Sequence, residues 1–194
     1  MPVTINGNGT ITGVSVGGLP DGIVDTDMLA ADSVTAPKIG SKTFTSYALI
    51  CDQKGANDSG GTFSANTTVT RDLNTEIIDA DGIVSIAGNQ FTLQAGTYLI
   101  KASAPAFFVD RHVAWLHNET DGAVVQYGTS EFAEAVNGCT TRSFISARTT
   151  ISGAKNFRIK HRCQTTKSSN GLGVKNDYSG SNSIYTIVEI FKEA

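Results

Sequence analysis

Cysteine, long apolar runs and charge are all scarce in this 194-residue sequence, and each scarcity excludes a class of protein. Three cysteines, Cys51, Cys139 and Cys163, are too few and too scattered for a disulfide scaffold. No apolar run approaches the roughly 20 residues that cross a bilayer, so we expect no membrane insertion. The first residues show no basic start followed by an apolar stretch, so we expect no secretion signal.

The charge balance argues against a nucleic-acid partner. Lys and Arg number 15 and Asp and Glu 18, which gives a net charge of −3. A protein that neutralises phosphates needs an excess of cations. Charged residues make up only 17% of the chain and hydrophobic residues 40%, which excludes an extended disordered chain.

Small polar residues are abundant instead, and they predict an all-β fold. Thr, Ser and Asn together contribute 52 residues, beside 20 Gly, a composition that favours short strands and turns. Ten short strands without intervening helices indicate a sandwich or barrel. We predict strands over 43–51, 62–72, 83–86, 89–94, 97–104, 111–118, 122–130, 140–149, 155–163 and 184–192.

The beginning of the chain differs from the rest. Residues 1–40 carry four Asp against Lys38, while residues 41–194 hold 14 charges of each sign. Apolar residues recur about every five positions in this segment, which is too sparse to form a core of its own. We therefore divide the chain into an N-terminal anchor or trimerisation segment, residues 1–42, and a head domain, residues 43–194.

Two stretches of the head resemble a known fold family. Phe91-Thr92-Leu93-Gln94-Ala95-Gly96-Thr97-Tyr98-Leu99-Ile100 resembles the Gly-x-Tyr signature of the complement-head and tumour-necrosis-factor-like jelly roll. The run from Ile184 to Ile190 is similar to the closing strand of that family. This resemblance implies a jelly-roll sandwich.

A second resemblance is to small virion fibre proteins of marine tailed bacteriophages, cyanophages especially. It rests on four stretches: Asn6–Gly22, Arg71–Glu76, Gln90–Tyr98 and Lys160–Thr166. The resemblance implies a homotrimer with an N-terminal attachment or shaft segment and a jelly-roll head. It also implies contact with other virion proteins through the first segment, and assembly into the virion in the host cytoplasm.

Both faces of the last predicted strand are largely apolar, which indicates a subunit contact. We expect Ile184, Thr186, Val188 and Ile190 to face one way and Tyr185, Ile187, Glu189 and Phe191 the other. Three copies around an axis would cover such surface. The candidate trimer contacts are Tyr185, Ile187, Phe191, Met28 and Leu29.

The longest irregular stretch, residues 164–182, is the candidate recognition loop. Amides, hydroxyls, an aromatic ring and a few charges suit a saccharide, here a host cell-surface polysaccharide. The candidate receptor-binding residues are Lys167, Asn170, Lys175, Asn176 and Tyr178. The alternative is that this loop is disordered or simply exposed to solvent and recognises no ligand.

Charge is unevenly distributed in the head. Residues 135–176 contain eight Lys or Arg and no Asp or Glu, whereas residues 110–134 contain five acidic residues against Arg111. The two stretches either neutralise each other or leave a basic band that attracts anionic glycan.

Four groups of residues resemble catalytic or metal sites, and a structural role is the preferred interpretation of each. None supplies the three or four converging ligands of a metal site or a complete catalytic set. We therefore expect no enzyme, cofactor or metal. The groups are Asp110 with His112 and His117, His161 with Cys163, Asp79 with Asp81, and Glu131 with Glu134.

These observations predict a non-enzymatic bacteriophage virion protein, a trimeric tail fibre or spike whose head attaches to the host surface. A capsid fibre or decoration protein is the alternative within that class. A glycan depolymerase is an alternative from another class, and a cytokine-like ligand is a third.

Overall fold

The computed structural model describes residues 4–5, 11–12 and 44–193. The chain separates into two compact units, residues 1–42 and 43–194. In the first unit, strands β1 (Thr4–Ile5) and β2 (Ile11–Thr12) pair antiparallel. Within the described residues, no helix is long and apolar enough to cross a membrane.

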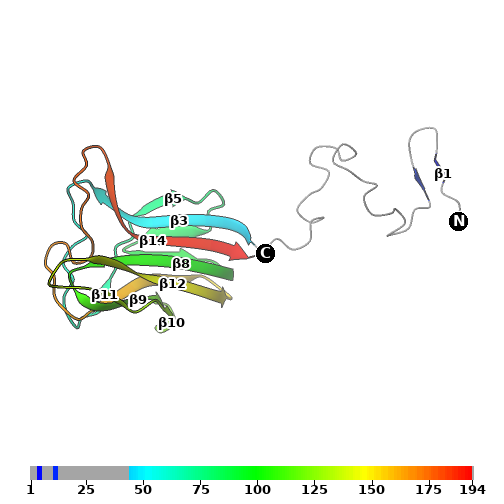
Figure 1. Cartoon of the computed structure of the whole chain (residues 1–194). Coiled ribbons are helices and arrows are strands. Elements are labelled where there is room, and N and C mark those ends of the chain that lie inside the picture. Colours follow the sequence, from blue (N-terminus) through cyan, green and yellow to red (C-terminus); the bar gives the residue numbers. More distant parts are fainter. Residues whose placement is uncertain (1–3, 6–10, 13–43, 194) are drawn as a thin grey trace. The chain divides into compact units, whose positions relative to one another are not determined.

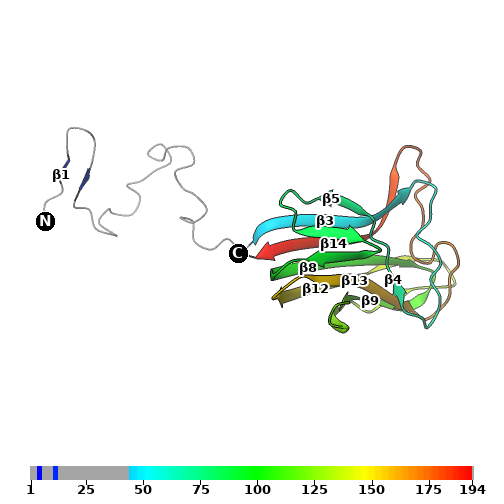
Figure 2. The same cartoon turned by 180° about the vertical axis from the view of Figure 1, so that it is seen from behind.

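The second unit is built from two antiparallel sheets (Figures 1 and 2). The five-stranded sheet has the order β12-β8-β14-β3-β5, with bounds Thr140–Ile151, Gly96–Phe107, Asn182–Glu193, Phe44–Gly55 and Thr75–Ile78. The seven-stranded sheet has the order β10-β9-β13-β7-β6, with bounds Ala123–Tyr127, Asp110–Asn118, Lys155–Cys163, Gln90–Leu93 and Val84–Ala87. In this second sheet β11 (Glu131–Ala133) also pairs with β9, and β4 (Val69–Thr70) with β13.

The order of the strands defines a jelly roll, as the sequence predicts. From β7 the long strands alternate between the sheets, because β8, β12 and β14 lie in one sheet and β9 and β13 in the other. The first and last strands of the unit, β3 and β14, are neighbours. Two sheets wound in this way form the double-sheet sandwich of that fold.

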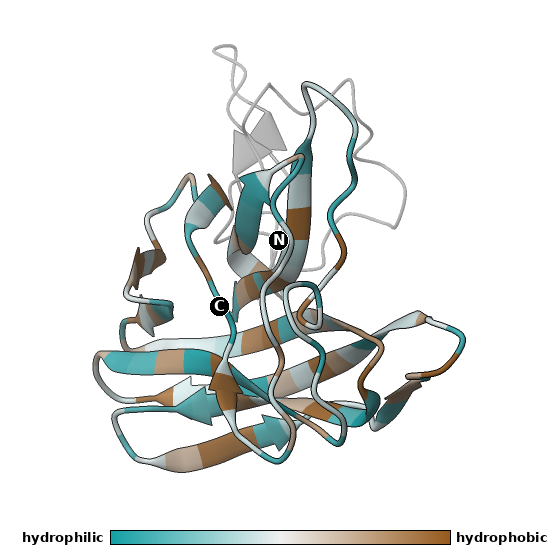
Figure 3. Ribbon diagram, turned by 90° about the vertical axis from the view of Figure 1, so that its left-hand side faces the viewer, coloured by the Kyte–Doolittle hydropathy of each residue, from teal (hydrophilic) through white to brown (hydrophobic). Residues whose placement is uncertain are grey.

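The core lies between the two sheets. Alternate residues of each strand point inward, and hydrophobic and hydrophilic residues alternate along the ribbons in Figure 3. Ile100, Leu116, Phe157 and Val188 are among the fully buried residues, and the Phe91 and Phe157 rings stack at 5.5 Å. Each such side chain contributes about 1.5–3 kcal/mol through burial.

The stretch Arg71–Glu76 attaches the chain to the end of β3. The Asn74 side chain accepts from the Gln53 amide at 2.9 Å and donates to the Gln53 carbonyl at 3.0 Å, so it imitates a strand neighbour. Asp72 forms an ion pair with Lys54. The side chains of Asp72 and Asn74 thus hold the chain to β3 before the regular pairing of β5 begins at Thr75.

Two differences from the predicted strands concern irregular segments. The predicted strand 62–72 contains only β4 and one isolated bridge, between Phe63 and Lys167. A turn interrupts it, because Asn66 has a left-handed backbone with φ of 57°. The short strands β5 and β11 were not predicted, because four and three residues are too few to show a period.

The predicted faces of β14 are wrong at its beginning. The strand has a bulge between Ile184 and Ile187, where its register against β3 shifts. Tyr185 and Thr186 are both buried as a result, whereas Ile184 is exposed. The predicted alternation holds from Ile187 to Phe191.

Candidate functional site

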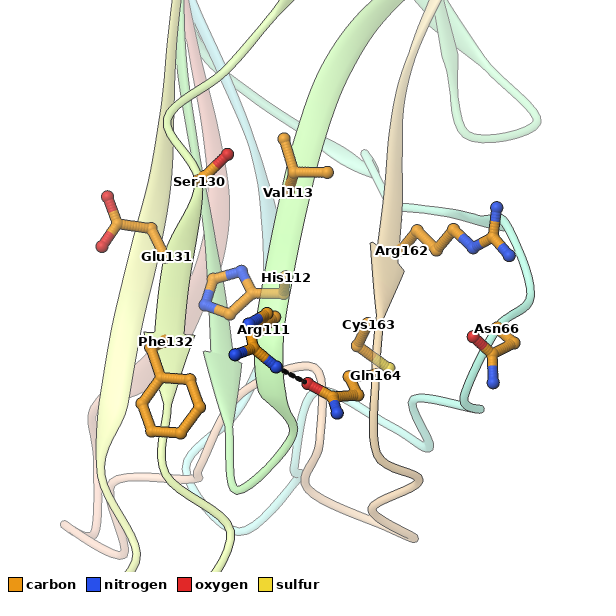
Figure 4. Close-up of a pocket in the computed structure, with 10 residues that line it drawn as sticks. All are labelled: Asn66, Arg111, His112, Val113, Ser130, Glu131, Phe132, Arg162, Cys163 and Gln164. Carbon is orange, nitrogen blue, oxygen red and sulfur yellow. Dashed lines mark hydrogen bonds between the residues drawn. The ribbon is translucent and has the colours of Figure 1, made fainter.

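A pocket of about 650 Å³ opens on the outer side of the seven-stranded sheet. Three strands, β9, β11 and β13, with residues next to them and Asn66 from the turn before β4, supply its walls (Figure 4). It is lined by Asn66, Arg111, His112, Val113, Ser130, Glu131, Phe132, Arg162, Cys163 and Gln164.

Strand pairing sets the order of these residues across the pocket. Phe132 of β11 lies opposite Arg111 of β9, and the Gln164 amide donates to the Arg111 carbonyl at 2.9 Å. Two residues further along β9, Val113 lies opposite Arg162 of β13. Paired residues share a face of the sheet, so a ring, two guanidinium groups and an amide stand side by side.

The positive charges of the two arginines in the pocket are not neutralised by ion pairs within residues 44–193. Arg111 donates to the Gln164 side-chain oxygen at 3.0 Å, as the dashed line in Figure 4 shows. Among residues 44–193, no carboxylate lies within ion-pair distance of Arg111 or Arg162. Glu131 is the carboxylate among the lining residues, and Figure 4 places it on the side opposite Arg162.

Aromatic side chains continue along the same face. Phe132 is 51% exposed and Tyr127 is 58% exposed. Tyr127 of β10 lies opposite Trp115 of β9, and their ring centroids are 5.7 Å apart. Trp115 is an odd-numbered β9 residue like Arg111, so both project outward. The face therefore combines exposed rings with cationic and amide donors.

Two histidines lie beneath this face. His112 Nδ1 and His161 Nε2 are 2.9 Å apart, and His112 Nε2 lies 2.7 Å from the Thr141 hydroxyl. Burial lowers the pKa of His112 to about 4 and that of His161 well below its usual range, and the nearby Arg71 cation acts in the same direction. Both rings are therefore neutral near pH 7.

Arg71 is buried at the same end of the core. Its Nε donates to the Thr186 hydroxyl at 2.8 Å and its guanidinium to the Leu172 carbonyl at 2.7 Å. Burial lowers the pKa of Arg71 to about 10, and Asp52 opposes that shift. The guanidinium keeps its charge at pH 7 and fastens the 164–181 loop to β14.

The predicted recognition loop is held against residues 56–66 by backbone hydrogen bonds. Phe63 and Lys167 exchange two of them, at 2.9 and 3.0 Å, and the Asp177 amide donates to the Ala56 carbonyl. The loop is therefore a packed part of the sandwich end.

The five candidate receptor-binding residues have different surroundings. Tyr178 is 76% exposed, and Lys175 is paired with Asp177. Lys167 lies over the Phe108 ring at 4.5 Å, and the side-chain oxygen of Asn170 is buried. The Asn176 side chain accepts from Tyr178 and Ser181 and donates to the Asn182 carbonyl at the start of β14.

The predicted trimer contacts are only partly at the surface. Tyr185 is 2% exposed and its hydroxyl donates to the Asp58 carbonyl, so its assignment as a subunit contact is wrong. The bulge in β14 turns it inward. Ile187 and Phe191 are half-buried on the outer side of the five-stranded sheet. Met28 and Leu29 lie outside the described residues.

An aromatic cluster surrounds Phe191 on that outer side. Its ring centroid lies 5.2 Å from that of Phe44 and 4.9 Å from that of Tyr47. Phe144 is 57% exposed and lines a second hollow together with Ile187. The outer side of the five-stranded sheet is thus rich in apolar groups.

The unevenly distributed charges of the head neutralise each other only in part. Lys155 pairs with Asp121 and Lys160 with Glu119, so the basic stretch meets the acidic one across adjacent segments. Arg148 pairs with Glu193. Arg142 donates to the Tyr185 carbonyl and to Ser103. With Lys175, which pairs with Asp177, half of the eight cations have a carboxylate partner. Among residues 44–193 the other four have none: Arg142, Arg158, Arg162 and Lys167.

The residues that resemble catalytic or metal sites have structural contacts. Burial raises the pKa of the Cys163 thiol to about 11, and the thiol donates to backbone carbonyls. Asp79 accepts from the Ile83 and Val84 amides in its turn. Asp110 accepts from the Ala135 amide, and Glu134 accepts from Asn137. No cluster of three potential metal ligands occurs in the described parts of the chain.

Sequence reasoning missed the pocket although it singled out some of its members. Arg162 falls within the basic stretch 135–176 and the resemblance at Lys160–Thr166, and Glu131 was considered only with Glu134 as a catalytic pair. The signal lay in the alternation of Arg111, Val113 and Trp115 on one face of a predicted strand. What brings Phe132 beside them is β11, which was not predicted.

The fold and its surfaces define a jelly-roll sandwich with an outward-facing pocket. No protein-family model and no curated protein sequence matches the chain. Similar solved structures include the globular domain of zebrafish complement 1qA protein, with 14% identity, a TM-score of 0.47, and coverage of 75% of this chain and 95% of that one. Murine APRIL at pH 5.0 has 7% identity, a TM-score of 0.46, and coverage of 75% and 98%.

Proposed function

We propose that this chain is a non-enzymatic virion protein of a tailed bacteriophage, a homotrimeric fibre or spike whose jelly-roll head attaches to the host surface. The phage assignment rests on the sequence resemblance at residues 6–22, 71–76, 90–98 and 160–166. The observation that carries the assembly is the apolar outer side of the five-stranded sheet. Ile187, Phe191 and Phe144 leave large apolar surface there that a partner of the same kind would cover.

The N-terminal unit provides the attachment to other virion proteins in this proposal, and the head provides the contact with host polysaccharide. Placement on the tail is preferred, and a capsid fibre or decoration protein is the alternative.

Two measurements test the proposal. Light scattering should give about 61 kDa, three times the chain mass of 20.4 kDa, and a monomer at micromolar concentration would contradict the trimer. Antibody-labelled electron microscopy of particles should place the protein on the tail. Label on the capsid would favour the alternative, and an unlabelled particle would overturn the virion assignment. Turnover of host polysaccharide by the purified protein would indicate a depolymerase instead.

A further inference from the structure

We propose that the pocket between β11, β9 and β13 binds a carboxylate-bearing saccharide. This inference rests on the proposed attachment function and deepens it by naming the class of receptor. It also places the receptor contact on the side of the sandwich, whereas the sequence pointed to the loop around Tyr178.

The charge of the pocket fits a carboxylate. Arg162 is exposed and has no carboxylate partner among residues 44–193, and Arg111 is held by the neutral Gln164 amide. A guanidinium offers a planar pair of N–H donors that matches the two oxygens of a carboxylate. The hydrogen bond to Gln164 fixes the Arg111 side chain and leaves further N–H groups of that arginine free to donate.

The neighbouring groups fit the rest of a sugar. Phe132 presents a half-exposed ring directly opposite Arg111, and such a ring packs against the C–H face of a pyranose. Asn66 and Gln164 provide amide donors and acceptors for hydroxyl groups. A mainly apolar hollow with a few placed polar groups is the usual composition of a small-molecule site.

The length of the face suits an oligosaccharide better than a single anion. Phe132 lies opposite Arg111 and Tyr127 lies opposite Trp115, four residues further along β9. At the rise of an antiparallel strand these two aromatic positions are about 14 Å apart. A chain of sugars lying along β9 would therefore reach both.

A nucleic acid fits this surface less well. The chain has a net charge of −3, and Glu131 lines one side of the pocket. Binding of a nucleic acid depends on neutralising successive phosphates with cations, and the lining of this pocket offers two, Arg111 and Arg162.

The single tryptophan provides the measurement, because Trp115 lies on the same face. The full-length protein is titrated with trimers of galacturonate, mannuronate and glucuronate, with sialyllactose, and with the methyl esters of the same compounds. A twelve-nucleotide single-stranded DNA serves as the competing polyanion. We expect a saturable change in Trp115 fluorescence with at least one free acid, and binding at least tenfold weaker with its ester.

Matched variants locate the site. Arg162→Gln and Phe132→Ala should each weaken binding about tenfold or more, since each removes a group that contacts the ligand. Arg148→Gln is the control, because it changes an exposed arginine on the other sheet, where Glu193 neutralises it. Tyr178→Ala tests the loop and should leave binding unchanged. Circular dichroism and thermal melting verify that every variant is folded.

Three results would overturn the inference: no free acid binds better than its ester, Arg162→Gln binds as well as the wild type, or the DNA binds more tightly than every saccharide. These failures differ from failure of the proposed function. If the protein is found on particles but binds no acidic sugar, only the proposed class of ligand is wrong. If the protein binds an acidic sugar but is absent from particles, only the virion assignment is wrong.

Discussion

The imidazoles of His112 and His161 share a hydrogen bond that is lost when both rings are protonated. They lie inside the core with Phe63 packed on His161, and the Arg71 cation acts on both rings. Glu131 is the one carboxylate that favours protonation of His112. Protonation of either histidine would add a positive charge next to the Arg71 cation, with Glu131 as the opposing carboxylate for His112.

This cluster predicts a loss of stability in mild acid. Unfolded His112 binds a proton below about pH 6.5, whereas the folded ring stays neutral down to about pH 4. The unfolded state binds more protons in that window, so the free energy of unfolding falls as the pH is lowered from 6.5 to 4. For His112 the full effect is about 3 kcal/mol. Chemical denaturation at half-unit steps of pH measures it.

A pair of variants isolates the contribution of the ring. His112→Asn cannot take up a proton at this position and should reduce the pH dependence between 6.5 and 4 to the part that His161 contributes, at some cost in stability at pH 7. His117→Asn removes an imidazole near the surface that contacts Glu119, and it should keep the wild-type slope. Equal slopes in the two variants would assign the acid sensitivity to other groups.

Two glycines of the 164–181 loop make a second test at the residue scale. A Cβ on Gly173 would overlap the Tyr185 ring, whereas a Cβ on Gly180 would meet nothing within 4 Å, and both glycines have positive φ. Gly180→Ala should cost about 1 kcal/mol from backbone strain alone. Gly173→Ala should cost roughly 3 kcal/mol or more, because a fully buried ring must move. Equal melting temperatures would mean that the loop shifts freely.

At the scale of elements, the long strands follow from their residue pattern and the short ones do not. The ranges predicted for β9, β13 and β14 agree with the structure to within two residues. Their faces depend on register, and one bulge after Ile184 was enough to place Tyr185 in the core. Predicting the pocket requires the pairing of the strands as well as their positions. Phe132 and Arg162 are 30 positions apart, and they come together only because β9 pairs with both β11 and β13.

The corrected faces of β14 give a sharper prediction for assembly. Phe191→Asp places a charge among Phe44 and Tyr47 on the outer side of the five-stranded sheet, so it should dissociate the proposed trimer while the head stays folded. Phe132→Asp puts the same charge on the outer side of the other sheet and should remain trimeric. Light scattering with circular dichroism distinguishes the outcomes, and a trimeric Phe191→Asp would contradict this placement of the contact.

At the scale of the whole molecule, the two units have separate expected roles. Residues 43–194 contain both sheets and both hydrophobic clusters, so a protein without residues 1–42 should fold and melt cooperatively. If the first unit is the anchor, that truncated protein should no longer enter particles. The measurement is its abundance in purified virions beside the full-length protein, and equal incorporation would place the anchor in the head.

The position of β14 also determines when the head can fold during synthesis. This strand lies in the middle of its sheet, between β3 and β8, although β3 precedes it by more than a hundred residues. Until β14 leaves the ribosome, β3 and β8 have no partner between them and each presents an unpaired edge. Such edges are templates for pairing with another chain, and polysomes bring identical chains close together. Production of this protein should therefore benefit from a low rate of translation initiation, which spaces the nascent chains apart on the messenger RNA.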